Sequence, residues 1–174
     1  MAIDSYNNYS GFVKNLENFT SQLLRGDIDI NSPNSTDSIH AYLNGANSNA
    51  VSKHIDSKFR KANGIFFTCE LLAEIVASRI KNELASGYSV LDPTCGSGDL
   101  LLACTKYMPL EKTLSRTLES WSAMIYGFDL YDDFVRSAKS RIQLSAISRH
   151  LELSKSKPEN FEYLGNINIS DFLA

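Results

Sequence analysis

Residues 90–103, VLDPTCGSGDLLLA, join a short apolar run to a leucine-rich segment through a loop that contains two glycines. Gly96 and Gly98 can adopt positive φ angles and so bring bare backbone against a ligand. The segment that begins at Asp99 reads as a helix, whose free N–H groups favour an anionic ligand group. The stretch therefore predicts a strand, a ligand-binding turn and a helix, which is the first unit of an α/β sheet.

The same alternation of helix and strand extends on both sides of this turn. Upstream, a helix capped by Thr68 carries one broad apolar face and ends at Gly87. The other predicted elements are strands at 88–91, 124–128 and 166–169 and helices at 99–106, 110–121 and 134–147, with a polar stretch at 155–160 ahead of the last strand. This order predicts an α/β fold with about three parallel strands and right-handed crossovers.

The first sixty residues read as a small helical N-terminal cap. Apolar residues recur at helical spacing from Ser10, and this helix stops near Gly26. A second, short helix is expected to begin at a Ser35/Thr36 cap and to end near Gly45. We therefore divide the chain into a cap at residues 1–60 and an α/β domain at residues 61–174.

Composition indicates a globular protein but does not identify a binding partner. The chain has 174 residues, 43% of them hydrophobic, which suffices for a real core, and its net charge of −3 predicts no global basic field for nucleic acid. The scattered cysteines and histidines predict reduced thiols, no zinc site and surface imidazoles: Cys69, Cys95, Cys104, His40, His54 and His150. The sequence contains neither a long apolar run nor a signal-like start, so we expect a cytoplasmic protein without a membrane span.

Three classes of ligand compete for the glycine loop. A nucleoside triphosphate is disfavoured because no Lys and Ser/Thr pair follows Gly98, and a dinucleotide is disfavoured because Leu101 stands where a small residue is needed. S-adenosylmethionine is the third class. Asp92 suits its ammonium group, and Asp129, at the end of the next predicted strand, suits a ribose diol beside Leu130. The structural alternatives are a plain tight turn at the glycines and a helix-capping role for Asp129.

Four motifs in order resemble the amino-methylating DNA methyltransferases in which the cofactor half precedes the catalytic half. They are GIFFTCELLAEIV (64–76), VLDPTCGSGDLLLA (90–103), IYGFDLYDD (125–133) and NINISDFL (166–173). The resemblance covers about residues 60–174 and implies a partial Rossmann-like methyltransferase domain. The type that the resemblance implies is adenine-N6, as in the modification subunits of type I restriction-modification systems.

The resemblance also implies the role of individual residues. Phe67 and Thr68 would contact the methionine part of S-adenosylmethionine, and Asp129 would hold the ribose. The remaining expected cofactor contacts are the loop residues Asp92, Pro93, Gly96 and Gly98 and the adenine contacts Leu130, Asp171 and Phe172. Cys69 stands where the family usually has proline, and an acidic strand end such as Asp171 can also be merely solvated. No catalytic residue and no metal ligand are assigned.

One family motif is absent from the sequence. The family polarises its target amino group with (Asn/Asp/Ser)-Pro-Pro-(Tyr/Phe), whereas the four prolines here, Pro33, Pro93, Pro109 and Pro158, are all separated. We therefore expect a cofactor-binding portion that is truncated before this motif and inactive alone. Alternatives are a methyltransferase for another amine, such as cytosine N4 or a protein glutamine, and a non-catalytic remnant or partner subunit.

The expected partners follow from the same resemblance. DNA would be the substrate of the full-length enzyme, and a specificity or restriction subunit is a candidate partner. The family's strand order of 3-2-1-4-5 would leave the first strand as a bare edge here, which predicts self-association.

Overall fold

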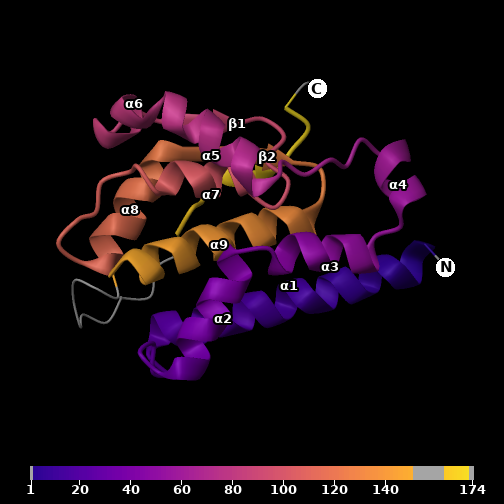
Figure 1. The fold of residues 1–174 in the computed structure, drawn as a ribbon, viewed down its shortest axis with the longest axis horizontal. Coiled ribbons are helices and arrows are strands. Elements are labelled where there is room, and N and C mark those ends of the chain that lie inside the picture. Colours follow the sequence, from indigo (N-terminus) through magenta and orange to yellow (C-terminus); the bar gives the residue numbers. More distant parts are fainter. Residues whose placement is uncertain (1, 151–162, 173–174) are drawn as a thin grey trace.

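The computed structural model describes residues 2–150 and 163–172, with side chains from residue 8 onward. Helices and strands alternate in its second half (Figure 1). The elements are α1 (Ala2–Arg25), α2 (Pro33–Leu43), α3 (Ala46–His54), α4 (Ser57–Ala62), α5 (Glu70–Arg79), α6 (Lys81–Ala85), β1 (Val90–Asp92), α7 (Asp99–Thr105), α8 (Leu114–Met124), β2 (Ile125–Asp129), α9 (Asp132–His150) and β3 (Ile167–Ile169). The predicted polar stretch at 155–160 lies outside the described residues.

The three strands form one parallel sheet in the order β1-β2-β3. Leu91 pairs with Tyr126, and Asp129 pairs with Ile169. The α/β class with a three-stranded parallel sheet is therefore confirmed. Because the strands are parallel, the loops that follow them open at the same edge of the sheet.

Helix α9 is the centre of the molecule. One side of it packs on β2 and β3, and the opposite side packs on α1 and α2, so α9 lies between the sheet and the cap in Figure 1. Leu16, Leu23 and Ile39 from the cap belong to the same hydrophobic cluster as Leu101 of α7 and Ile142 of α9. The cap and the sheet thus share a core, and the boundary at residue 60 stays a prediction.

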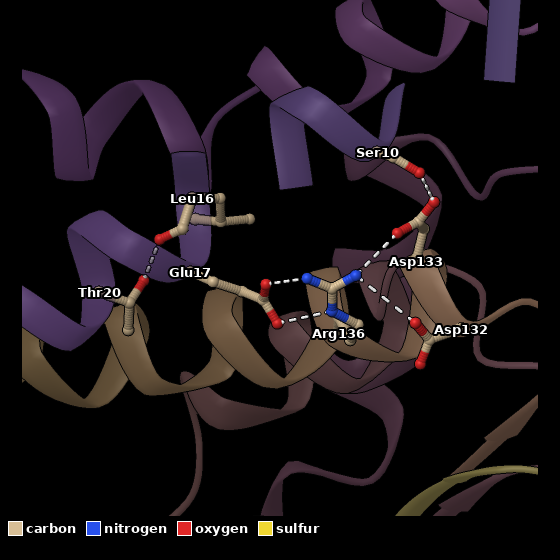
Figure 2. A network of polar contacts seen from close by, with 7 residues as sticks. All are labelled: Ser10, Leu16, Glu17, Thr20, Asp132, Asp133 and Arg136. Atoms are coloured by element: carbon tan, nitrogen blue, oxygen red, sulfur yellow. Dashed lines mark hydrogen bonds and ion pairs between the residues drawn. The ribbon is translucent and has the colours of Figure 1, made fainter. Parts of the chain in front are cut away.

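Polar contacts also fix α1 to α9 (Figure 2). The Arg136 guanidinium donates to Glu17 of α1, with Nε 2.8 Å from Oε1, and its Nη1 lies 3.1 Å from Asp133 Oδ1. Ser10 donates to the other oxygen of Asp133. The contacts that Glu17 and Ser10 make with α9 fix the orientation of α1. Because Arg136 is partly exposed, its ion pairs add little to the free energy of unfolding.

The predicted apolar helix after residue 68 differs from the observed one in its N-cap, its continuity and its buried face. Its N-cap is Cys69 and not Thr68, and the helix is interrupted at Ile80, which separates α5 from α6. The helix also packs on α7 through Ala73 and Ala77, while Leu71 is 72% exposed. Small side chains allow closer helix approach, so the alanines and not the large residues face α7. The larger apolar residues of the face are exposed: Leu71, Leu72, Ile75, Val76 and Ile80.

Other sequence predictions also need correction. Helix α1 begins at Ala2 instead of Ser10, and α2 is capped by Ser32, whose side chain accepts a hydrogen bond from the Ser35 N–H. Pro33 explains this start, because its fixed φ suits the first helical position. His150 is not a surface residue: it is 4% exposed, and its Nε2 lies 2.8 Å from the Thr117 hydroxyl of α8.

None of the helices in the described residues combines the length and the apolar character that a bilayer span requires.

Candidate functional site

A cavity of about 530 Å³ opens where the three strands end. This volume lies in the range of small-molecule sites, roughly 300–1,000 Å³. Four segments line it: residues 63–67, the loop after β1 with Pro93, Thr94 and Gly96, the connection from β2 to α9 with Asp129, Leu130, Tyr131 and Phe134, and the residues after β3, Ser170, Asp171 and Phe172. The parallel topology therefore brings distant parts of the sequence to one site.

A smaller cavity of about 120 Å³ shares part of this lining. Phe66, Phe67 and Gly96 contribute to both cavities, and Thr68 and Asp92 line only the smaller one. Of the predicted site residues, Phe67, Thr68, Asp92, Pro93, Gly96, Asp129, Leu130, Asp171 and Phe172 line one or both. The structure thus brings these nine residues together, while their contacts with a ligand stay predictions.

Gly98 occupies a different environment from Gly96. It lines neither cavity, and a Cβ built on it would lie 2.9 Å from the Cβ of Ala138 in α9. Its φ of +81° and this close approach both require glycine. The structure therefore gives Gly98 a packing role that the sequence did not indicate, and its predicted contact with a ligand stays untested.

Asp129 joins the end of β2 to the glycine loop. Its Oδ2 accepts a hydrogen bond from the Gly96 N–H at 2.9 Å, and its Oδ1 accepts one from the Tyr131 N–H at 3.0 Å. Both bonds use carboxylate oxygens that have further lone pairs available for hydroxyl donors. Tyr131 precedes α9, whose first backbone bonds run from Phe134 and Val135 to the Tyr131 carbonyl, so Asp129 supports the entry to α9 and faces the cavity at the same time.

Negative charge gathers around Asp92. Burial raises the pKa of the Asp92 carboxyl, the Thr94 N–H that it binds lowers it, and the nearby carboxylates of Asp129 and Asp99 raise it again. Burial, followed by the charges of Asp129 and Asp92, raises the pKa of the Cys95 thiol to about 12. A raised pKa disfavours the nucleophilic thiolate form of Cys95, whereas the carboxylates would gain stability from a cationic ligand group.

Aromatic and apolar side chains form the rest of the wall. Phe67 stands edge-on to Phe134 with ring centroids 5.3 Å apart, which fixes the segment before α5 against α9. At the other end, Phe172 lies 5.5 Å from Phe128, tilted by 31°. Leu130 and Phe172 are 62% and 48% exposed, so both have apolar surface available to cover a planar ligand.

Sequence reasoning missed Arg141, which is 4% exposed and supports the glycine loop from behind. Its Nη1 donates to the Ser97 carbonyl at 2.8 Å and to Asp99 Oδ1 at 2.7 Å. A local signal existed, because Arg141 shares the buried side of α9 with Phe134, Ala138 and Ile142. A charged residue within an apolar stripe has to find partners inside the protein.

Comparison with known proteins agrees with this geometry. A family model described as N-6 DNA methylase matches residues 51–156. The matched range is more than half of the chain and includes the segment before α5, the glycine loop and the end of β2. The chain matches no solved structure.

Proposed function

Because the chain belongs to the N-6 DNA methylase family, we propose that it forms the S-adenosylmethionine-binding portion of a site-specific DNA adenine-N6 methyltransferase. The enzyme would serve in a restriction-modification or related defence system. The observation that carries the proposal is the cavity of about 530 Å³ at the strand ends, where the glycine loop meets Asp129, Asp171 and Phe172. Ligands of open parallel sheets bind in such a position.

The chemistry of the lining fits this cofactor. S-adenosylmethionine carries an ammonium and a sulfonium, and a cationic group beside Asp92 would offset both the burial of this carboxylate and its repulsion by Asp129 and Asp99. Asp129 has carboxylate oxygens for the ribose hydroxyls, and Phe172 has exposed apolar surface for the adenine ring. When bound, the cofactor supplies an electrophilic methyl group, and these residues would hold and orient it.

The acceptor of the methyl group is not assigned from these residues. The sequence has no adjacent prolines, so it does not contain the motif with which the family polarises an amino group. We propose that the 174 residues bind the cofactor and do not transfer the methyl group by themselves. Methyltransferases that act on cytosine N4 or on a protein glutamine have similar cofactor loops. The family match favours adenine N6 as the acceptor.

Partners beyond the cofactor follow from the family. We propose DNA as the substrate of the full enzyme, and a specificity or restriction subunit stays a prediction. In the described sheet β1 pairs only with β2, so self-association through its free edge also stays a prediction. Sedimentation at two protein concentrations would measure it.

The test is calorimetric titration of the protein with S-adenosylmethionine, beside Asp129→Ala. A hydrogen bond to a charged group is worth about 1.5–3 kcal/mol, so we expect saturable binding in the wild type and an affinity at least about tenfold lower in the variant. Asp37→Ala is the matched control because it removes an exposed carboxylate of α2, outside both cavities. Because Asp129 also binds the Gly96 N–H, the melting temperature of each variant is measured alongside.

Two results would contradict the proposal. The first is a wild-type protein that shows no saturable binding. The second is an Asp129→Ala variant that binds as tightly as Asp37→Ala while both remain folded, since the strand-end carboxylate would then lie outside the ligand site.

A further inference from the structure

A buried asparagine of the cap contacts the glycine loop. Asn47 lies in the first turn of α3 and is 0% exposed, and its Nδ2 donates to the Ser97 hydroxyl at 2.7 Å. Ser97 is also 0% exposed and stands between Gly96 and Gly98. This bond joins residues fifty positions apart and links the helical cap directly to the candidate cofactor loop.

The carbonyl end of the same amide faces two other elements. Asn47 Oδ1 accepts hydrogen bonds from the Tyr9 hydroxyl of α1 at 2.9 Å and from the Ser137 hydroxyl of α9 at 3.1 Å. Burial raises the pKa of Tyr9 to about 12, so its hydroxyl stays protonated and remains a donor. With both ends of the amide bound, the side chain of Asn47 has one orientation, and its N–H points at the loop.

The loop needs support from outside itself. Gly96 and Gly98 have φ angles of +51° and +81°, and because glycine is conformationally permissive, these two positions do not restrict the loop to one conformation by themselves. Arg141 holds the Ser97 carbonyl, and Asn47 holds the Ser97 hydroxyl. Neither Ser97 nor Asn47 lines the cavities, so both bonds act on the back of the loop, while Gly96 lines the front.

We propose that Asn47 is a positioning residue for the cofactor loop, through which the helical cap sets the affinity of the site without touching the ligand. The inference rests on the proposed cofactor function and adds a structural requirement to it. Without the amide, the Ser97 hydroxyl loses its hydrogen bond to Asn47, and the neighbouring Gly96 N–H changes its position relative to Asp129.

A merely structural asparagine would have a different effect. Such a residue would stabilise the packing of α1, α3 and α9, and its loss would lower the melting temperature without changing the ligand affinity of the folded protein. The Ser137 hydroxyl separates the two cases, because it donates to the carbonyl end of the same amide, whereas the loop residue Ser97 accepts from the other end. Ser137→Ala is therefore the matched control.

The experiment compares the full chain carrying Asn47→Ala, Ser97→Ala, the double substitution and Ser137→Ala. Affinity for S-adenosylmethionine is measured by calorimetry at a temperature where each variant is folded, and amide hydrogen exchange of residues 95–99 is measured without ligand. We expect Asn47→Ala and Ser97→Ala each to weaken binding about tenfold and to speed exchange in the loop. The double substitution should weaken binding no further, because Asn47→Ala and Ser97→Ala both remove the same bond between Asn47 and Ser97. Ser137→Ala should lower the melting temperature and keep affinity within about twofold.

The outcomes distinguish this inference from the proposed function. If the wild type does not bind the cofactor, the proposed function fails, and the exchange data alone decide the positioning role. Equal loop exchange in Asn47→Ala and Ser137→Ala overturns the inference, as does equal affinity of these two variants. If Asn47→Ala does not fold, Ser97→Ala removes the same bond with a smaller change and decides the question against the same control.

Discussion

Gly98→Ala tests whether the glycine loop is built around close contact with α9. The φ of Gly98 is +81°, and a Cβ placed on it would lie 2.9 Å from Ala138 Cβ and 3.2 Å from Ala138 Cα. Carbon atoms reach their optimal contact at about 3.5–4.0 Å. One of the two contacted atoms is backbone, so a side-chain rotation cannot relieve the overlap, and the loop or α9 has to move.

The expected loss of stability is the sum of two costs. An L-residue in the left-handed region costs about 1–2 kcal/mol, and overpacking against a helix costs about 1–3 kcal/mol. We therefore expect Gly98→Ala to lower the free energy of unfolding by about 2–5 kcal/mol. For a domain of this size each kcal/mol shifts Tm by about 2–4 °C, so Tm should fall by roughly 4–20 °C.

Two other glycines separate these costs. Gly45 has a φ of +93° with nothing within 4 Å of its built Cβ, so Gly45→Ala carries the backbone cost alone. Gly11 is an exposed residue of α1 without a positive φ and also has nothing within 4 Å, so Gly11→Ala should gain about 0.5–1 kcal/mol of helix stability. The predicted order of Tm is Gly11→Ala, wild type, Gly45→Ala and Gly98→Ala, from highest to lowest.

Thermal unfolding followed by circular dichroism, with urea denaturation as a second measure, gives this order directly. If Gly98→Ala melts at or above Gly45→Ala, the contact with Ala138 imposes no cost and the packing role of Gly98 is refuted. If all three variants have the same Tm as the wild type, the positive φ angles of Gly45 and Gly98 are not maintained in solution.

Two further predictions concern charge. Burial raises the folded pKa of Asp92 above its unfolded value, so stability is lost as pH rises through the folded pKa and the carboxylate ionises. Asp92→Asn should therefore raise Tm at pH 7 while weakening S-adenosylmethionine binding in calorimetry; a variant with lower Tm and unchanged affinity would contradict this. Burial, followed by the charge of Arg149, lowers the pKa of His150 below its usual value of 6.5. The unfolded state therefore binds more protons than the folded state as pH falls through 6.5, and the free energy of unfolding decreases in that range. The fall in Tm between pH 7.5 and 5.5 should shrink in His150→Gln and not in His54→Gln; equal falls in both variants would refute the assignment.

The order of helices and strands could be read from the sequence because hydrophobic periodicity is a local property. The strand before residue 92, the turn after it and Asp129 at the end of the next strand all follow from patterns within a few residues. The cavity lining follows from these as well, since parallel strands carry their final residues to one edge of the sheet. Local chemistry thus predicted the glycine turn with Asp92 and Asp129, whereas Phe67, Thr68, Asp171 and Phe172 were expected only from the family resemblance.

Local patterns did not predict which face of a helix is buried. The apolar residues of α5 cover much of its circumference, and only contact with α7 selects Ala73 and Ala77 over Leu71. The cap at Cys69 in place of Thr68 is a similar case, because the turn before α5 is fixed by Phe67 against Phe134. Packing partners that lie far away in sequence decide both outcomes.

The sequence by itself determined the α/β order, the glycine turn and the carboxylates at the strand ends, because each depends on the residues beside it. Only the tertiary structure decided that Gly98 faces Ala138, that Arg141 holds Ser97, and that Asn47 of the cap reaches the same loop. These contacts join residues forty or more positions apart. The role of a buried polar group or of a glycine depends on the residues that the fold packs against it, and local sequence does not specify those residues.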